Sequence, residues 1–383
     1  MKIDQIFNQC QEKFASPLFI FEMANNHMGD VEHGLKIIRD IHEVVKDFFV
    51  LGWNFAFKFQ YRDLDTFIHP DYKNRMDLKY VKRFSETKLS EEDVLKLKNE
   101  AQKLGFITIC TPFDEKSVEN IVKHGYDIIK VASCSFTDWP LLEQIIQTDK
   151  PIVASIGGAK IEDIDKVVSF FQHRNKKFAI MHCVGQYPTP ADQLQLNQIS
   201  LLKKRYPEVV IGFSTHESPD NFEAVKLAVA KRAGFFEKHV AIKSEKYPIN
   251  AYSATPEQIR KWLEAAREAY IYCGVAGQRH EFAQQELADI RQFQRGVFAV
   301  SDIKAGERVE VKNTFFAFPN QAGQVLANGM SKYMILNALK DFKKNEPILA
   351  ADVSQLDARE KVYEAVEKVN KLLRQANIPF SNK

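Results

Sequence analysis

Eight short apolar runs recur along the chain, and this repetition constrains the fold more than any other feature of the sequence. The runs are Leu18–Ala24, Phe55–Gln60, Phe106–Thr111, Asp127–Ser133, Pro151–Ser155, Phe178–Val184, Val209–Ser214 and Phe235–Val240. The segments between them carry apolar residues at helical spacing, as in the stretch from Val31 to Val45. Eight strands that alternate with helices close into a parallel barrel. The sequence therefore predicts an α/β protein built on a (β/α)8 (TIM) barrel.

Polar side chains gather at the C-terminal ends of these runs, where such a barrel places its active site. They are Glu22, Lys58, Gln60, Thr111, Lys130, Ser133, Ser155, Tyr187, Ser214, His216 and His239. Residues two apart on a strand face the same side. Lys58 and Gln60 are therefore expected to point together into the barrel mouth, as are Ser214 and His216. Reactive side chains at so many strand ends indicate an enzyme.

The composition argues against several other classes of protein. The formal net charge of +3 over 383 residues suggests neither a nucleic-acid surface nor a polybasic membrane anchor. Five scattered cysteines without a CxxC pair argue against a disulfide framework or a zinc cluster. The first residues lack an apolar core of signal-peptide length, and the longest apolar stretch, Phe48 to Phe59, is too short to span a bilayer. We expect a soluble, cytoplasmic protein.

Changes in the residue pattern along the sequence divide the chain into three parts. Residues 1–285 hold the predicted barrel, 286–353 form a small β-rich module, and 354–383 form a helical tail. The short alternating runs of the module are Val297–Val300, Arg308–Val311 and Thr314–Phe318. From Leu356 to Ala376, valines and leucines recur at helical spacing among charged residues. This pattern predicts an amphipathic helix that docks on the barrel or on a partner.

Two histidines are candidate metal ligands. His216 and His239 lie at the ends of the seventh and eighth runs. Neighbouring strands are about 4.8 Å apart, so both imidazoles can reach one ion. Two imidazoles without a carboxylate or thiolate form an open ligand set, which suits a labile Mn²⁺, Co²⁺ or Zn²⁺ rather than a structural zinc. The alternative is that either histidine simply makes hydrogen bonds in the core.

Lys58 and Lys130 lie inside otherwise apolar runs, where an ammonium group must be paired or must meet an anion. The hydroxyl groups expected near them belong to Thr111, Ser133, Ser155 and Ser214. Two lysines ringed by hydroxyls favour a cradle for a small phosphate-bearing carboxylate. An ion pair with Glu22 or Glu237 is the structural alternative, and a Schiff-base lysine is the functional one. In its apolar run, Glu22 can also hold a raised pKa and act as acid, base or hydroxyl anchor.

Seven motifs follow the order of the sialic acid synthase family, and the chain resembles that family from about Phe19 to His239. The motifs are FEMANNHMGD, FKFQ, TPFDEKSVE, IKVAS, MHCVGQYPTP, GFSTHE and EKHV. The segment from about Arg295 to Val353 resembles the family's antifreeze-like (SAF) C-terminal domain, notably in VFAVSDIKAGERV and DFKKNEPILAADV. Seven ordered motifs with the matching second domain form a specific signal, although any one alone is weak.

The resemblance implies a transferase that condenses phosphoenolpyruvate with an open-chain aldose or amino sugar, giving a 2-keto-3-deoxy sugar acid and phosphate. The residues implied to bind phosphoenolpyruvate are Lys58, Thr111, Lys130, Ser133, Ser155 and Ser214. His216 and His239 would hold a divalent metal, Mn²⁺ first and Co²⁺, Mg²⁺ or Zn²⁺ as alternatives. Glu22, Gln60 and Tyr187 would face the acceptor sugar. Family members are homodimers in which the SAF domain of one subunit caps the active site of the other.

The departures from the family pattern fall on the acceptor side of the implied site. Ser135 replaces an acidic residue, Gly185 an asparagine, and Asn250 an aspartate, so that Asn250 is the candidate for contact with an altered sugar. The arginine normally supplied by the SAF domain is replaced near Phe318. We therefore expect an acceptor other than N-acetylmannosamine, such as another aldose or amino sugar of bacterial surface-glycan synthesis.

Three other functions fit part of the pattern. A related phosphoenolpyruvate-dependent synthase with an eight- or seven-carbon product would keep the same lysines and metal ligands. A class I aldolase would use Lys58 or Lys130 as a Schiff base. A catalytically silent barrel would act as a binding or regulatory protein, but such a barrel is expected to lose lysines or metal ligands, and this chain keeps both sets.

Overall fold

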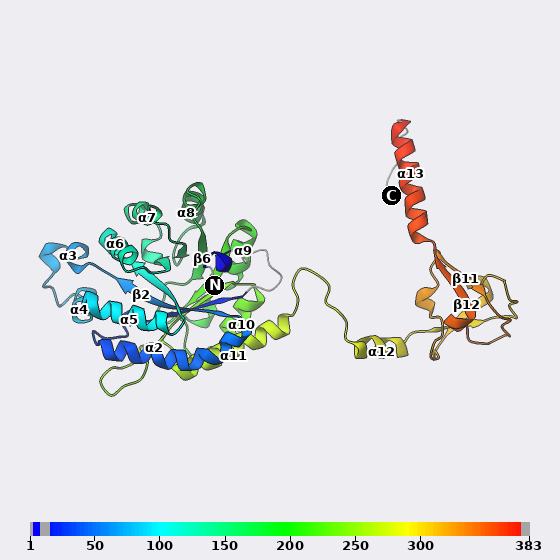
Figure 1. Cartoon of the computed structure of the whole chain (residues 1–383), viewed down its shortest axis with the longest axis horizontal. Coiled ribbons are helices and arrows are strands. Elements are labelled where there is room, and N and C mark those ends of the chain that lie inside the picture. The colour runs from blue at the N-terminus through cyan, green and yellow to red at the C-terminus, as the bar shows by residue number, and fades with distance from the viewer. Residues whose placement is uncertain (1–2, 8–15, 377–383) are drawn as a thin grey trace. The chain divides into compact units, whose positions relative to one another are not determined.

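The computed structural model describes residues 3–7 and 16–376, and the chain separates into two compact units, Met1–Arg279 and His280–Lys383. The first unit contains a closed barrel of eight parallel strands, each paired with its neighbours in sequence, with β8 paired to β1 (Figure 1). The strands are β1 (Leu18–Glu22), β2 (Asn54–Tyr61), β3 (Ile107–Pro112), β4 (Ile128–Val131), β5 (Ile152–Ser155), β6 (Phe178–Cys183), β7 (Val210–Thr215) and β8 (Phe235–His239). The predicted TIM barrel is confirmed.

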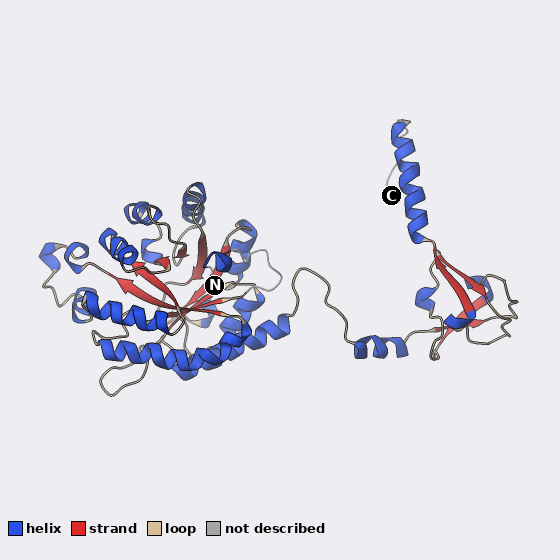
Figure 2. Cartoon of the chain, in the orientation of Figure 1, coloured by secondary structure: helices blue, strands red, loops and turns tan. Residues whose placement is uncertain are grey.

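Helices follow the strands and cover the outside of the barrel (Figure 2). The main ones are α2 (Val31–Val45), α5 (Glu91–Lys103), α6 (Glu115–Lys123), α7 (Trp139–Ile146), α8 (Ile161–His173), α9 (Asn197–Arg205), α10 (Glu223–Ala230) and α11 (Pro256–Cys273), with short 3₁₀ turns at η1 (Lys46–Leu51), η3 (Ser133–Ser135) and η4 (Ala191–Gln193). Local sequence fixes where several helices begin. The side chains of Ser90, Asp114 and Thr255 accept hydrogen bonds from backbone N–H groups three residues later.

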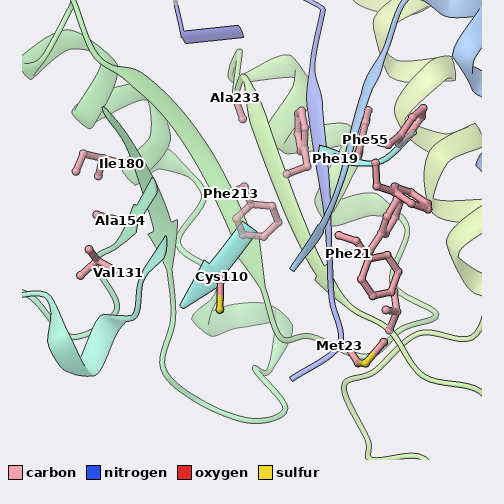
Figure 3. Packing of buried hydrophobic residues seen from close by; sticks show 14 of the residues in the cluster. Phe19, Phe21, Met23, Phe55, Cys110, Val131, Ala154, Ile180, Phe213 and Ala233 are labelled. Atoms are coloured by element: carbon pink, nitrogen blue, oxygen red, sulfur yellow. The ribbon is translucent and has the colours of Figure 1, made fainter. Parts of the chain in front are cut away.

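The strands bury side chains on both faces because helices cover the outside and the barrel encloses the inside. Phe19, Phe21, Phe55 and Phe213 belong to the large apolar cluster that strands and helices share (Figure 3). The alternate residues form a separate cluster inside the barrel, made of Leu18, Ile20, Ala56, Ile109, Ile128, Val153, Ala179, Met181, Val210 and Phe235. The interior toward the N-terminal ends of the strands is therefore a packed apolar core.

The helix α1 (Ile3–Phe7) completes this inner cluster. Ile6 and Phe7 are buried in it, and the ring of Phe7 lies edge-on to Phe235 with 5.3 Å between centroids. A glycine on β7 makes room for the packing, since a Cβ atom at Gly212 would lie 2.3 Å from Sδ of Met181. Among the described residues, the lower end of the barrel is thus filled by apolar side chains.

The long, charged stretch between β2 and α5 folds into short helical pieces, α3 (Leu64–Phe67), η2 (Pro70–Tyr72) and α4 (Lys79–Glu86). Asp63 starts α3 by accepting hydrogen bonds from the backbone N–H groups of Asp65 and Thr66. The segment follows the C-terminal end of β2 and so belongs to the end of the barrel that carries the polar residues.

The second unit has its own small apolar core, formed by residues such as Val297, Ile303, Leu336 and Ile348. Its elements are α12 (Gln284–Gln292), β9 (Gly296–Ala299), η5 (Val311–Asn313), β10 (Thr314–Ala317), η6 (Ala327–Gly329), β11 (Met334–Ala338), η7 (Ala350–Asp352), β12 (Val353–Asp357) and α13 (Arg359–Gln375). β9 pairs antiparallel with β10, and β11 with β12.

Two details of the second unit differ from the sequence-based expectation. The run Arg308–Val311 is not a strand, because Glu310 and Asn313 cap η5 and leave Arg308 with a single bridge to Asn337. The helix predicted from Leu356 begins at Arg359, since residues 353–357 pair with β11. In the part of the chain that the structure describes, no helix is long and apolar enough to cross a membrane.

Candidate active site

The upper half of the barrel interior opens into a cavity of about 1220 Å³ at the C-terminal ends of the strands. All twelve candidate site residues line it: Glu22, Lys58, Gln60, Thr111, Lys130, Ser133, Ser155, Tyr187, Ser214, His216, His239 and Asn250. Several of them converge because, on β1 to β5 and on β8, an apolar residue of the lower layer is followed two positions later by a polar residue on the same face. On β8, for example, Phe235 lies in the lower cluster, and Glu237 and His239 line the cavity.

Four buried charges form the floor of the cavity. Lys58 contacts the carboxylate of Glu22 and lies 3.4 Å from Oε1 of Glu237, and Lys130 Nζ lies 2.6 Å from Oε2 of Glu237. Ser214 donates a hydrogen bond of 3.3 Å to Glu237. Both lysines thus meet the carboxylates named as structural alternatives and also face the cavity. The two positive and two negative charges balance one another within the barrel.

The protonation of this floor depends on burial and on the neighbouring charges. Burial lowers the pKa of Lys58 to about 8, although Glu237 opposes this shift. Burial by itself raises the pKa of Glu237, but the Coulombic attraction of Lys130 and Lys58 outweighs burial and brings this pKa far below its usual range. Glu237 is therefore a carboxylate near neutral pH.

Hydroxyl groups surround the lysines and have hydrogen-bonding capacity to spare. Lys58 Nζ donates to Oγ1 of Thr111 at 3.4 Å, and Ser133 Oγ accepts from the backbone N–H of Gly157 at 3.0 Å. The hydroxyl oxygen of Ser155 is buried and has no hydrogen-bond partner among the described residues. Buried polar atoms rarely stay unpaired, so this hydroxyl indicates a ligand in the cavity.

The two histidines lie side by side at the ends of β7 and β8, with 5.3 Å between ring centroids. Nδ1 of His216 lies 3.0 Å from the carbonyl oxygen of Val184, so that Nε2 of the neutral ring keeps its lone pair. Nδ1 of His239 is buried without a hydrogen-bond partner among the described residues. Burial lowers the pKa of His216 to about 4 and that of His239 well below its usual value. Two neutral imidazoles with available lone pairs suit a divalent cation.

The described residues include no cluster of three or more His, Cys, Asp or Glu side chains able to hold a metal. A cation at the histidine pair would therefore take its remaining ligands from water or substrate, as an open, reactive site requires. Aromatic rings flank the pair. Tyr187 lies 4.0 Å from His216, and Tyr252 lies edge-on to His239 at 5.1 Å, both measured between centroids.

Asn250 lines the cavity, but part of its side chain shapes the loop after β8. Its Oδ1 accepts hydrogen bonds from the backbone N–H groups of Tyr252 and Ser253 at 3.1 and 2.9 Å. Its Nδ2 donates to Oδ1 of Asn26 at 3.2 Å. These bonds place Asn250 in the wall close to Tyr252, and its contact with a sugar stays a prediction.

Reasoning from the sequence missed two residues that line the cavity, Arg62 and Tyr252, and gave a third, Glu237, too small a role. Glu237 was considered only as a counter-ion, although its place two residues before His239 puts both side chains on one face of β8. The same alternation extends from Lys58 and Gln60 to Arg62, which also lines the cavity. Tyr252 lies in a loop, where no periodic pattern marks it.

A closed (β/α)8 barrel with a buried lysine–carboxylate floor beside two neutral histidines has the features of an enzyme that handles a small anion. The chain matches the NeuB family model over residues 52–278. It belongs to the NeuB family, which confirms the resemblance to the sialic acid synthases and identifies the protein as a transferase of that type.

Known relatives support this assignment. A solved structure assigned as spore coat polysaccharide biosynthesis protein E from Chromobacterium violaceum is 53% identical, with a TM-score of 0.85, and covers 88% of this chain and 99% of that one. The sialic acid synthetase of Leptospira borgpetersenii, solved with citrate, is 27% identical, with a TM-score of 0.63, and covers 72% and 92%. Spore coat polysaccharide biosynthesis protein SpsE of Bacillus subtilis is 28% identical over 340 residues, 84% of this chain and 89% of that protein.

Proposed function

We propose that the protein condenses phosphoenolpyruvate with the aldehyde form of a sugar, giving a 2-keto-3-deoxy sugar acid and inorganic phosphate. The observation that carries the proposal is the cavity floor, where two buried lysines ringed by hydroxyls lie beside two neutral histidines. The sialic acid synthetase among the relatives supports a reaction of this type.

Phosphoenolpyruvate is the ligand that the floor suits best. Its phosphate and carboxylate carry the negative charges that Lys58 and Lys130 attract, and they can accept hydrogen bonds from Ser155 and the other hydroxyls. Both lysines contact carboxylates and lie among hydroxyl groups, a paired and polar setting that favours anion binding over Schiff-base formation. A ligand anion competes with Glu22 and Glu237 for these ammonium groups, so binding rearranges the floor's hydrogen bonds.

The proposed reaction forms one carbon–carbon bond and breaks one carbon–oxygen bond. C3 of phosphoenolpyruvate attacks C1 of the open-chain sugar, whose carbonyl oxygen takes up a proton. Water then adds to C2, phosphate leaves with its bridging oxygen, and C2 becomes the keto carbon. The barrel would hold the two substrates in one cavity, where the positioning of C3 against C1 favours the reaction.

His216 and His239 are the residues that would hold the divalent cation, with Mn²⁺ as the first candidate. When bound, the cation supplies Lewis-acid polarisation of the aldehyde oxygen. The unpaired Nδ1 of His239 supports this assignment, because a buried lone pair without a partner is costly unless a ligand uses it. Gln60, Tyr187 and Glu22 line the same cavity, and we assign them to the hydroxyl groups of the acceptor.

The acceptor is proposed to be a sugar other than N-acetylmannosamine, from bacterial surface-polysaccharide synthesis. The two relatives named for spore coat polysaccharide biosynthesis support this direction. We further propose that the second unit is an antifreeze-like domain and that the enzyme is a cytoplasmic homodimer in which this domain caps the partner's cavity. The domain assignment and the proposed capping are based on the resemblance of the segment from about Arg295 to Val353 to the family's antifreeze-like domain.

Phosphate release from phosphoenolpyruvate tests the proposal with metal-loaded protein and a panel of aldoses and N-acylated amino sugars. Release should require both metal and one class of sugar, and His239→Ala should abolish it. His182→Ala is the matched control, because His182 is also buried but its Nε2 is already hydrogen-bonded to the carbonyl oxygen of Leu194. Metal-independent release, or full activity in His239→Ala, would contradict the proposal.

A further inference from the structure

Arg62 lies directly after β2 and continues the row of side chains that Lys58 and Gln60 begin. Its Nη2 donates a hydrogen bond of 2.9 Å to Oε1 of Gln60, and Gln60 Nε2 donates one of 3.4 Å to Oε1 of Glu22. Two hydrogen bonds therefore separate Arg62 from the ion pair at the floor. This places the guanidinium group in the wall next to the proposed acceptor residues rather than at the phosphoenolpyruvate lysines.

Two aromatic rings hold the guanidinium group in place. Its central carbon lies 3.6 Å from the centroid of the Phe113 ring and 4.1 Å from that of Phe84. Phe113 follows β3 and Phe84 belongs to α4, so the clamp joins two separate loops at the mouth of the cavity. Stacking of this kind leaves the edge of the planar group free for hydrogen bonds.

Arg62 has no carboxylate partner among the described residues. In the described part of the chain it forms no ion pair, and its Nε is buried without a hydrogen-bond partner. Asp114 is near enough to interact electrostatically, but its oxygens accept hydrogen bonds from the backbone of Asp63 and from Ser117. A buried guanidinium donor without an acceptor is costly, which indicates that an anion from outside the chain completes this site.

The charge of the surrounding wall points the same way. Between residues 62 and 84 the basic side chains that line the cavity are those of Arg62, Lys79 and Arg83, and no aspartate or glutamate of this segment lines it. Across the described lining the carboxylates are Glu22 and Glu237, and both already contact lysines at the floor. The charges at the floor balance one another, so the excess positive charge among the residues that line this cavity belongs to the outer wall.

We propose that Arg62 binds an anionic substituent of the acceptor sugar, either a phosphate monoester or a carboxylate, so that the acceptor is a charged aldose. This inference rests on the proposed condensation and names the class of acceptor for it. The planar guanidinium edge matches either group through paired N–H···O bonds. The volume of about 1220 Å³ exceeds the range of about 300–1,000 Å³ common for single ligands, which leaves room for a sugar beyond phosphoenolpyruvate.

The test compares sets of aldoses, each supplied as the neutral sugar, its terminal monophosphate and the corresponding uronic acid. Formation of 2-keto-3-deoxy acid is measured with saturating phosphoenolpyruvate and metal. We expect one charged form to be used at least about 100-fold better in kcat/KM than its neutral parent, since a charge-assisted bidentate contact is lost in the parent. Which charged form is preferred distinguishes the phosphate from the carboxylate.

Variants then assign the selectivity to Arg62. Arg62→Gln should lower kcat/KM for the charged acceptor by about 100-fold, mainly through KM, and should leave KM for phosphoenolpyruvate within about 3-fold. Arg62→Lys should recover part of the loss. Arg174→Gln is the matched control, because the Arg174 guanidinium group also stacks on an aromatic ring, that of Phe170 at 3.9 Å, but Arg174 does not line the cavity, and it should change selectivity by less than about 3-fold.

The outcomes separate this inference from the proposed function. Condensation with neutral and charged acceptors at equal rates, or an equal loss for both in Arg62→Gln, would overturn the charged-acceptor assignment and leave the condensation intact. An equal loss with a lowered melting temperature would show that Arg62 only anchors the two loops. If no aldose of any form yields a keto acid, the proposed function fails and this inference falls with it.

Discussion

The lower and upper layers of the barrel interior come from the same eight strands, yet their chemistry is opposite. On β8, Phe235 fills the lower layer, whereas Glu237 and His239 line the cavity above it. The lower layer excludes water and packs apolar side chains. The upper layer buries four charges, and in it Ser155 Oγ and His239 Nδ1 find no hydrogen-bond partner within the described part of the chain. The difference shows that the fold is stabilised below, and that the layer above carries polar groups suited to a ligand.

The largest expected effect on stability comes from the lower layer. Phe235→Ala should lower the free energy of unfolding by about 3–5 kcal/mol, because it leaves a cavity beneath the floor and removes the contact with Phe7. Chemical denaturation measures this change. Phosphoenolpyruvate affinity of the folded protein should stay within about 3-fold of wild type. A stable variant that no longer binds phosphoenolpyruvate would break the division between the layers.

The next expected effect is on binding rather than on stability. Lys130→Met should weaken phosphoenolpyruvate binding by about 100-fold, measured by calorimetry, and cost only about 1–2 kcal/mol of stability. The stability cost is small because Glu237 keeps Lys58 at 3.4 Å and the hydrogen bond from Ser214.

Lys238 provides the matched control for this prediction. Its side chain is fully buried and contacts Glu217 at 2.8 Å, but it does not line the cavity. Lys238→Met should cost about 3–5 kcal/mol, because Glu217 would be left as a buried charge, and should leave phosphoenolpyruvate affinity nearly unchanged. If Lys130→Met and Lys238→Met lost similar amounts of stability and similar amounts of phosphoenolpyruvate affinity, the division between structure and binding would be wrong.

Much of this division was predictable from the sequence. The eight runs fixed the barrel, and the polar residue at each strand end predicted which side chains would line the mouth. Alternation placed Lys58 with Gln60 and Ser214 with His216, and all four line the cavity. The pattern is informative because a lysine or histidine on a buried parallel strand is costly unless it is paired or binds a ligand.

The pH dependence of the upper layer should have opposite signs for stability and for binding. Burial holds the pKa of Lys58 at about 8, against an ordinary value of 10.5. Between these values the unfolded chain binds a proton that the folded chain has released, so Lys58 makes the free energy of unfolding rise with pH in this window. Phosphoenolpyruvate binding should weaken over the same window, because the amine loses its charge.

Denaturation and calorimetry between pH about 7 and about 10 measure both trends. Lys58→Arg should abolish the loss of binding above pH 8, since a guanidinium group stays protonated there. A wild-type dissociation constant that is flat across this range would contradict the role given to Lys58.

The smallest expected effect concerns the wall near the histidines. Asn250→Asp keeps the acceptor for the backbone N–H groups of Tyr252 and Ser253 but turns the donor to Asn26 into a second acceptor. The free energy of unfolding should fall by about 1 kcal/mol, measured by denaturation. In a protein that already carries Asn26→Ala, the further loss caused by Asn250→Asp should be much smaller, because the opposing acceptor is gone. A loss above about 3 kcal/mol would mean that Asn250 holds more of the loop than these bonds account for.

Other features could not be predicted from the sequence, because they depend on segments that are distant along the chain. The clamp on Arg62 needs Phe84 from α4 and Phe113 from the loop after β3, which share no local pattern. Glu237 bridges two lysines from other strands, and a single run cannot reveal this. In the second unit, reciprocal capping by Glu310 and Asn313 replaced an expected strand with a 3₁₀ turn.

The most direct test of the central claim follows the oxygen that joins carbon and phosphorus in phosphoenolpyruvate. The enzyme is given phosphoenolpyruvate labelled with ¹⁸O at this bridging position, a divalent metal and its acceptor sugar, and the phosphate is analysed by ³¹P NMR. The account predicts that phosphate forms only when the sugar is present and that it carries the label, because the carbon–oxygen bond breaks. Unlabelled phosphate, or phosphate release in the absence of the sugar, would contradict a condensing site in the upper layer of the barrel.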